Sequence, residues 1–241
     1  MSIQRPRLKQ QAREIVRTAR PKVLYASAMF VALSALVSFL SSRLTGISLD
    51  AVSQYMSYLQ EGSTDTALSY IASQSPSPAA QLIDSALQIV MMIVGVGFTV
   101  FLFNTERRTG AVYGNLLDGF GPYFRLVLLE FVAAVFAALW SLLLVVPGIV
   151  AAYRYSMAKY VMLDHPDYSL MECIRESKRM TKGHKWELFM LDLSFLGYFL
   201  LSMLPLIGLV AQVWYMPYRE LSFLLAYEGL RTPDAQWVPV E

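Results

Sequence analysis

Long apolar runs separated by short charged stretches dominate the hydropathy pattern of the chain. The runs 23–42 and 85–105 contain no charged residue at all. About 20 apolar residues in an α-helix are enough to cross the hydrocarbon core of a bilayer. We therefore predict that each of these two runs crosses a membrane once, as a helix.

Two further apolar runs are too long for a single crossing. Residues 126–163 stay apolar over 38 positions, with only three charged side chains among them. One straight helix of that length would extend about 57 Å, nearly twice the ~30 Å core. Pro147 and Gly148 interrupt this run, and the segment 205–208 (PLIG) interrupts the run 188–230. Because proline breaks the helical hydrogen-bond ladder and glycine permits a turn, each run is predicted to contain two helices. The six predicted transmembrane segments are 23–42, 82–104, 126–146, 149–163, 187–204 and 207–229.

An amphipathic stretch precedes each pair of predicted spans. Apolar residues recur at helical spacing among charged ones in 6–20, and the pattern returns in 112–120 and 170–180. The third stretch begins with a capping box, Ser169 to Glu172, and Gly183 follows it as a candidate C-cap. Basic amphipathic helices of this kind lie in the membrane interface, and the alternative is an ordinary connector helix. The expected fold class is an all-α membrane protein with six transmembrane helices in three hairpins, each preceded by a cytoplasmic interfacial amphipathic helix.

A parallel internal repeat is a hypothesis that the second and third hairpins suggest. Residues 121–130 align with 183–192, which superimposes Glu130 on Asp192. Such repeats occur in transporters, and chance similarity among apolar residues is the competing explanation. With or without a repeat, we expect residues 1–241 to form a single multi-pass membrane domain.

The distribution of lysine and arginine predicts the orientation. Seven basic residues and one acidic residue precede the first span, whereas 43–84 carries one basic residue and four acidic ones. Cytoplasmic segments are enriched in lysine and arginine, so the N-terminus is predicted inside and the loop 45–81 outside. The five basic residues of 175–185 must also be inside, which requires six crossings rather than five. Both termini are then cytoplasmic. A short amphipathic helix is expected within the outer loop, from Leu49 to Leu59.

Composition and charge remove several classes of protein. Of 241 residues, 56% are hydrophobic and only 16% charged, which excludes a soluble globular enzyme. The single cysteine, Cys173, excludes an intrachain disulfide framework and a multi-cysteine metal cluster. A net charge of +2 is too small to indicate a nucleic-acid partner.

Ionisable residues inside the predicted spans are the candidates for a polar site. Each costs roughly 2.5–3.5 kcal/mol at mid-bilayer if it has no partner. We expect Lys159 to cluster with Glu130 and Asp192 at similar depth, and the deeper Arg154 to pair with Glu220. The functional interpretation is a site for a lipid headgroup or a proton relay, and the structural alternative is a set of ion pairs that orient helices. The six candidate residues are Glu130, Arg154, Lys159, Asp192, Arg219 and Glu220.

Catalytic and cofactor motifs are missing from the sequence. It contains no HExxH, P-loop, GxSxG or GxGxxG pattern, and its two histidines, His165 and His184, are too few for a histidine-rich metal site. Asp164-His165-Pro166-Asp167 is better explained as a turn between two helices. We therefore expect no enzymatic activity, no catalytic residue, no metal and no cofactor.

The C-terminal half resembles a known family. The strings VPGIVAAYRYSMAKYVMLD, ESKRMTKGHKWELFMLDLSFLGYFLL and LVAQVWYMPYRELSFLLAYEGL are similar to the bacterial integral membrane family named domain of unknown function 975. The similarity covers Val146 to about Leu230, and Lys159 departs from it because a small residue or proline is commoner there. The family is distantly similar to the membrane segment of some glycerophosphodiester phosphodiesterases, although no phosphodiesterase domain is present. The resemblance implies a bacterial cell membrane, several crossings and no cofactor, and it supplies no activity.

These observations lead to a non-enzymatic membrane protein that binds or handles a lipid or another amphiphile at the cytoplasmic leaflet. The alternatives are a small transporter or channel with a polar intramembrane pathway, and a scaffold or immunity-type partner of another membrane protein. The expected partners are membrane lipids, anionic ones above all, and the sequence leaves protein partners and oligomeric state open. The candidate anionic-lipid contacts are Arg5, Arg7, Arg13, Arg17, Arg20, Lys178, Arg179, Lys182 and Lys185.

Overall fold

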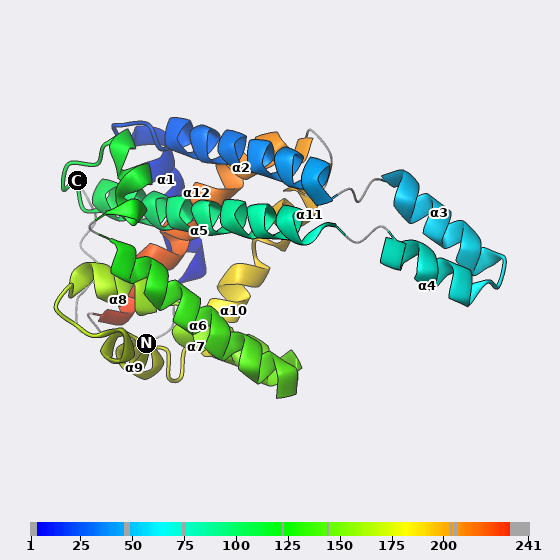
Figure 1. Cartoon of the computed structure of the whole chain (residues 1–241). Coiled ribbons are helices and arrows are strands. Elements are labelled where there is room, and N and C mark those ends of the chain that lie inside the picture. The colour runs from blue at the N-terminus through cyan, green and yellow to red at the C-terminus, as the bar shows by residue number, and fades with distance from the viewer. Residues whose placement is uncertain are drawn as a thin grey trace. The chain divides into compact units, whose positions relative to one another are not determined.

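The computed structural model describes residues 4–45, 49–73, 76–121, 123–143, 145–202, 204 and 207–231. Within these ranges every regular element is a helix, and none is a strand (Figure 1). The elements in chain order are α1 Arg5–Thr18, α2 Val23–Thr45, α3 Leu49–Gln60, α4 Thr64–Ser73, α5 Pro78–Glu106, the 3-10 helix η1 Tyr113–Phe120, α6 Phe124–Leu143, α7 Val145–Tyr155, α8 Ala158–Asp164, α9 Leu170–Met180, α10 Lys185–Leu193, α11 Leu196–Ser202 and α12 Ile207–Arg231.

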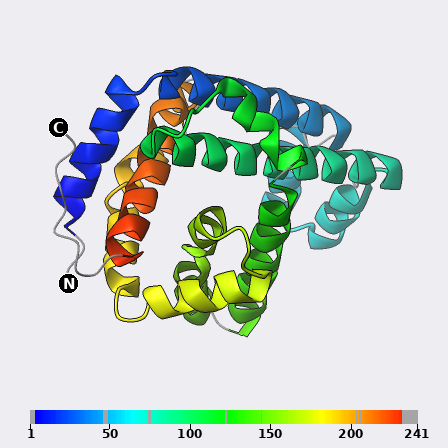
Figure 2. The ribbon, with the colours of Figure 1, turned by 90° about the vertical axis from the view of Figure 1, so that its left-hand side faces the viewer.

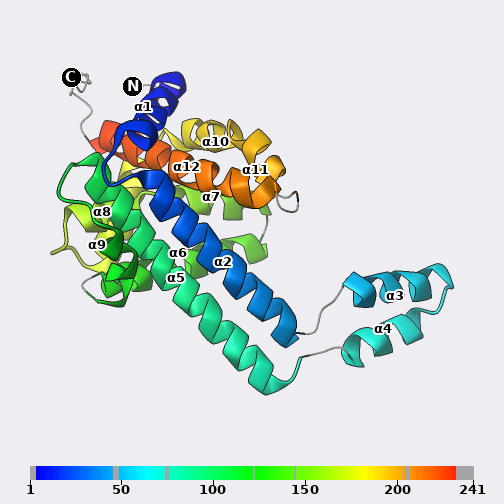
Figure 3. The same cartoon turned by 90° about the horizontal axis from the view of Figure 1, so that it is seen from above.

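The chain divides into two compact units. The first comprises Met1–Val31 and Ile93–Glu241, and the second comprises Ala32–Met92. Helices α2 and α5 belong to both units and run side by side (Figure 3). In the first unit Phe30 of α2 stacks on Phe98 of α5, with ring centroids 5.3 Å apart.

In the second unit, α3 and α4 pack against each other. The ring centroids of Tyr58 and Tyr70 lie 5.6 Å apart, and the Tyr70 hydroxyl donates to Gln54 Oε1 at 3.0 Å. The helix expected in the outer loop is present as α3, and α4 is an additional helix that the sequence analysis did not predict. In the same unit, the Ser41 hydroxyl of α2 donates to the Asp84 carboxylate of α5.

Three helices in the described part of the chain are long and apolar enough to span a membrane. They are Val23–Leu44, Pro78–Glu106 and Phe124–Leu142, which correspond to the predicted spans 23–42, 82–104 and 126–146. Helix α12 has 25 residues but includes four charged side chains between Arg219 and Arg231. The coarse prediction of an all-helical membrane protein is thus supported, with three spans that meet the criteria of length and composition.

Each of the predicted spans 149–163 and 187–204 is divided into two short helices. Helices α7 and α8, with 11 and 7 residues, are separated by a turn at Ser156–Met157. Helices α10 and α11, with 9 and 7 residues, are separated by a turn at Ser194–Phe195. At both breaks a serine hydroxyl donates to the carbonyl three residues earlier, at 2.9 and 2.5 Å. Such side-chain bonds compete with the helical ladder and bend it, and hydropathy does not detect them.

The break between α6 and α7 lies before Pro147, where we predicted it at Pro147–Gly148. Helix α6 ends at Leu143 and α7 begins at Val145, so Pro147 is in the first turn of α7. An N–H in the first turn of a helix has no intrahelical acceptor. Proline, which lacks this N–H, therefore costs no helical hydrogen bond there. Pro147 therefore lies inside the first turn of the second helix and does not end the first one.

The amphipathic helix predicted for 6–20 is present as α1, and its apolar side is covered by protein. Leu8, Ala12 and Val16 are buried, and α1 lies against α12 (Figure 2). Its Lys9 ammonium donates to the carbonyl and hydroxyl oxygens of Ser194, both at 3.0 Å, at the break between α10 and α11. The apolar stripe of α1 therefore packs on the helical body of the first unit, as in the connector-helix alternative.

The stretch 112–120 folds as a 3-10 helix and packs very closely on α5. A side-chain carbon at Gly97 of α5 would lie 2.2 Å from the Leu116 carbonyl oxygen, and one at Gly119 would lie 2.2 Å from the Ile93 carbonyl oxygen. Only glycine permits this approach of two backbones. We predicted an amphipathic helix here, with its four apolar residues on one face. Of these four, only Leu116 is buried, and Val112, Leu117 and Phe120 are exposed.

Candidate functional site

A cavity of about 550 Å³ lies in the first unit, between helices α6, α7, α8, α10 and α12. Five of the six ionisable residues predicted inside the spans line it: Glu130, Lys159, Asp192, Arg219 and Glu220. The ion-paired side chains of the lining come from α8, α10 and α12, whereas α6 contributes Glu130 and three alanines, Ala133, Ala134 and Ala137. The cavity is therefore lined by both charged and apolar side chains.

Lys159 and Glu220 form the first ion pair of the cavity. The Lys159 ammonium of α8 donates to Glu220 Oε1 of α12. The hydroxyl of Tyr160, a fully buried residue, donates to the same oxygen at 2.9 Å. Both charged side chains are mostly buried, with 22% and 16% of their surface exposed, so the pair is shielded from solvent.

Asp192 and Arg219 form the second pair. Arg219 Nε donates to Asp192 Oδ1 at 2.6 Å and its Nη2 donates to Oδ2 at 2.9 Å, a bidentate arrangement. The Tyr153 hydroxyl of α7 donates to Asp192 Oδ2 at 2.8 Å, and the guanidinium lies 4.9 Å from the centre of the Phe223 ring. Helices α7, α10 and α12 are thus joined at one carboxylate.

These pairs differ from the ones that the sequence suggested. We expected Arg154 to pair with Glu220, but Glu220 is bound by Lys159, and Arg154 is not among the residues that line the cavity. Arg154 Nε is buried with no hydrogen-bond partner among the described residues. The turn at Ser156–Met157 explains the difference, because it ends α7 and directs the next helix, with Lys159, toward α12.

The expected cluster of Glu130, Lys159 and Asp192 forms only in part. All three line one cavity, but Lys159 pairs with Glu220 and Asp192 pairs with Arg219. Glu130 has neither a hydrogen bond nor an ion pair with any residue that the structure describes.

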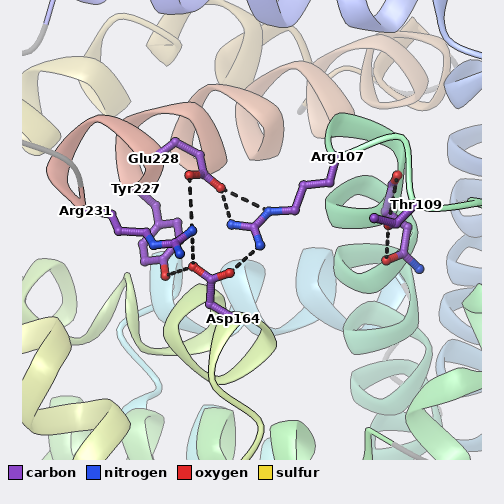
Figure 4. Close-up of polar contacts among 7 residues, drawn as sticks. Arg107, Thr109, Asp164, Tyr227, Glu228 and Arg231 are labelled. Atoms are coloured by element: carbon purple, nitrogen blue, oxygen red, sulfur yellow. Dashed lines mark hydrogen bonds and ion pairs between the residues drawn. The ribbon is translucent and has the colours of Figure 1, made fainter. Parts of the chain in front are cut away.

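A second charge network, which the sequence analysis missed, joins the C-terminal ends of α5, α8 and α12 (Figure 4). Asp164, at the end of α8, accepts hydrogen bonds from the Arg107 guanidinium and from the Tyr227 hydroxyl at 2.6 Å, and it forms an ion pair with Arg231 at 2.8 Å. Arg107 also donates to Glu228 Oε1, through Nη2 at 2.5 Å and Nε at 3.2 Å. Only 3% of the Asp164 side chain is exposed, so it is the centre of the network.

Electrostatics in this network favour the ionised carboxylate. Burial acts to raise the pKa of Asp164, but the hydrogen bonds from Arg107 and Tyr227 outweigh it and hold that pKa below its ordinary value. The sequence analysis assigns Asp164 only to a turn, and it gives no role to Arg107, which follows the apolar run 85–105. The sequence did contain a signal for this pair. Asp164 directly follows the predicted span 149–163 and Arg107 follows the span 82–104, and both spans are predicted to end on the cytoplasmic side.

The basic residues predicted to contact anionic lipid belong to two surfaces. Arg5, Arg7, Arg13 and Arg17 of α1 are exposed, and Arg13 also donates to the Tyr218 hydroxyl at 3.3 Å and lies over that ring. Around α9, Lys178, Arg179 and Lys182 are exposed and Lys185 is partly exposed, while Arg20 is exposed in the connection after α1. Helix α9 begins with the predicted capping box: Ser169 Oγ accepts from the Glu172 N–H at 3.3 Å, and the Glu172 carboxylate accepts from the Ser169 N–H at 2.7 Å.

Comparison with known proteins gives one match. The model of the family described as "Protein of unknown function (DUF975)" matches residues 82–234, which extends the resemblance noted in the sequence toward the N-terminus by about 60 residues. No curated protein sequence and no solved structure matches the chain. The similarity to phosphodiesterase membrane segments and the bacterial origin stay predictions. The residues of the cavity and of the charge network all lie within the matched range.

Proposed function

The chain belongs to the DUF975 family of proteins of unknown function, and we propose from the geometry of its cavity that it binds an amphiphile within a membrane, without enzymatic activity. The observation that carries this proposal is the mixed lining, with two ion pairs from α8, α10 and α12 and three alanines from α6. Ligand sites combine apolar walls with a few placed polar groups in volumes of about 300–1,000 Å³. An amphiphile has a polar head for the charged residues and an apolar body for the alanines.

The membrane location rests on the three apolar helices, and we extend it to six crossings. Helices α7–α8, α10–α11 and α12 would supply the fourth, fifth and sixth, the fourth and fifth as broken helices. Breaks at membrane depth are tolerated where the backbone is buried in protein or faces a cavity. The shared network of α5, α8 and α12 supports this topology, since the predicted second, fourth and sixth spans all end on the cytoplasmic side. Both termini would be cytoplasmic, in a bacterial cell membrane.

The basic surfaces of α1 and α9 favour the cytoplasmic leaflet as the place of binding. Helix α1 buries its apolar residues against α12 and leaves Arg5, Arg7 and Arg17 exposed. A juxtamembrane basic residue gains about 1 kcal/mol from anionic lipid. These residues would hold the protein against anionic lipid, while the cavity holds its ligand.

Native mass spectrometry with a cavity-filling variant tests the proposal. In Ala133→Phe the new ring would occupy the cavity, whereas in Ala138→Phe it would extend from an exposed position of the same helix outside the lining. We expect gently solubilised wild-type protein and Ala138→Phe to retain a bound amphiphile and Ala133→Phe to lose it. Equal retention by all three, or no retention by the wild type, would contradict the proposal.

Transport is a second candidate function, favoured by the breaks at Ser156–Met157 and Ser194–Phe195. Discontinuous helices beside a polar site are a recurrent feature of secondary transporters. In this chain the breaks lie close in sequence to the charged lining residues Lys159 and Asp192. Flux of the retained amphiphile across proteoliposomes, abolished in Ala133→Phe, would establish transport, and binding without flux would exclude it.

A further inference from the structure

The charged residues of the cavity do not balance. Two basic side chains, Lys159 and Arg219, face three acidic ones, Glu130, Asp192 and Glu220. Each basic group is engaged by one carboxylate, Lys159 by Glu220 and Arg219 by Asp192. One carboxyl group, that of Glu130, is left over.

Glu130 of α6 lines the same cavity as the Lys159–Glu220 pair and is partly buried. Among the described residues no donor forms a hydrogen bond with it. A carboxylate removed from water is expensive unless a cation or several donors compensate it.

We propose that the ligand of the cavity is a cationic amphiphile whose ammonium or other organic cation binds at Glu130. This proposal rests on the proposed function and adds the charge of the ligand to it. A cation would give the leftover carboxylate its missing partner. The apolar body of the ligand would lie along Ala133 and Ala137, one turn and two turns further along α6.

The rings of the cavity fit a cation as well. Tyr153 and Tyr155 belong to its lining. The faces of aromatic rings attract organic cations, which is how quaternary ammonium ligands are recognised in aromatic cages. The lining thus offers one carboxylate and two phenol rings to a positive head.

An anionic head is disfavoured by the same geometry. At Arg219 it would share the guanidinium with Asp192, which holds two hydrogen bonds of 2.6 and 2.9 Å, and at Lys159 it would share the ammonium with Glu220. In either place a second negative charge would lie beside a carboxylate in a poorly hydrated site, where like charges repel strongly. The pairs therefore select against an anion while Glu130 selects for a cation.

Two ions of nearly the same shape and opposite charge test the inference. Tetraphenylphosphonium and tetraphenylborate are titrated into the purified full-length protein in a neutral detergent, and binding is measured by calorimetry. We expect saturable binding of the cation and binding of the anion at least tenfold weaker. Glu130→Gln, which keeps the shape of the side chain, should weaken cation binding at least tenfold. Glu130→Asp should retain the preference, and Glu14→Gln, on the exposed face of α1, should match the wild type.

The outcomes separate this inference from the proposed function. Preferential binding of tetraphenylborate, or unchanged cation binding in Glu130→Gln, would overturn the assigned charge and leave the amphiphile site standing if Ala133→Phe still loses its ligand. If neither ion binds, the assignment of a cationic ligand is wrong, and the lipid retention of Ala133→Phe then decides the proposed function by itself. Thermal unfolding of each variant shows whether a loss of binding reflects loss of the fold. If Glu130→Gln does not fold, the cation and anion affinities of Glu130→Asp are compared with those of the wild type instead.

Discussion

The Ser27 hydroxyl of α2 donates a hydrogen bond of 2.7 Å to the carbonyl oxygen of Val213 in α12. Pro217 lies four residues after Val213, inside α12, and has no N–H to donate to that carbonyl. Ser27 is fully buried, so its hydroxyl replaces the missing helical bond where water has no access. The pair also fixes α2 against α12, because the freed carbonyl is available only at this turn.

Ser27→Ala should destabilise the protein by about 1–3 kcal/mol, the cost of leaving a buried carbonyl without a donor. Pro217→Ala restores an N–H at the position that bonds to Val213. We therefore expect Ser27→Ala to cost much less in the Pro217→Ala background than in the wild type. The unfolding midpoints of the wild type, the two single variants and the double variant, measured in detergent, give the coupling between Ser27 and Pro217. Equal effects of Ser27→Ala in both backgrounds would show that the hydroxyl does not compensate for the proline.

Lys159→Met should cost more stability than the double variant Lys159→Met/Glu220→Gln. The single change leaves the Glu220 carboxylate in a mostly buried place with only the Tyr160 hydroxyl beside it. Since the pair is intermediate between exposed and buried, we expect the single variant to lose about 1–3 kcal/mol and the double variant to recover most of that loss. Chemical or thermal unfolding of the three proteins measures the difference. A double variant no more stable than the single one would mean that the loss does not come from the unpaired Glu220 carboxylate.

Asp164 should make stability depend on pH in the acid range. Its pKa is lower in the folded protein than its ordinary value of about 3.9, so it contributes stability above that value and loses the contribution as pH falls through the folded pKa. We expect the difference in unfolding midpoint between wild type and Asp164→Asn to be constant from pH 8 to pH 5 and to shrink below about pH 4. Asp167→Asn, at an exposed position of the following turn, is the matched control. A difference that grows as the solution becomes more acidic would contradict the role given to Asp164.

Gly97→Ala should disrupt the packing of η1 on α5. The new methyl group would meet the Leu116 carbonyl at 2.2 Å, and because that atom belongs to the backbone it cannot rotate away. Overpacking of this kind costs typically 1–3 kcal/mol or more. Gly95→Ala is the control on the same helix, since nothing lies within 4 Å of a side-chain carbon there, and it should be neutral or slightly stabilising. Unfolding midpoints of both variants provide the comparison.

The predicted orientation is tested by labelling single cysteines in intact cells. In a Cys173→Ala background, Ser63→Cys should react with a membrane-impermeant maleimide, because it lies between α3 and α4 in the predicted outer loop. Lys182→Cys, exposed after α9, should react only after the cells are permeabilised. Labelling of Lys182→Cys in intact cells would reverse or remove the cytoplasmic assignment of that connection.

Hydropathy and helical spacing predicted most of the helices to within a few residues. The helix at 5–18, the three apolar helices and the capped helix at 170–180 depend on local patterns that the sequence displays directly. The breaks after Tyr155 and Leu193 depend on serine side-chain bonds, for which a serine in an apolar run is only a weak signal. The additional helix α4 is short and contains many polar residues, so the spacing of its apolar residues does not distinguish it from a loop.

Membership of the candidate site was easier to predict than its pairing. The cost of isolated charge in hydrocarbon selected six residues. Five of them line one cavity, and the sixth, Arg154, does not. The partners could not be derived from depth along straight helices, because the turn at 156–157 changes the direction in which Lys159 points. Arg107 and Asp164 were missed as a pair because their contact spans 57 residues and depends on how three helix ends converge.

The convergence of α5, α8 and α12 also determines when their charge network can form during synthesis. Arg107 is translated 57 residues before Asp164 and 121 residues before Glu228. At about 5–20 residues per second, its guanidinium waits roughly 6–24 s for its last partner. A chain that stops short of α12 would retain Asp164 without the Tyr227 hydroxyl and the Arg231 guanidinium that it otherwise binds. Synthesis of α12 is thus the event that completes this network, and a chain truncated before α12 would leave Asp164 paired with Arg107 alone among these residues.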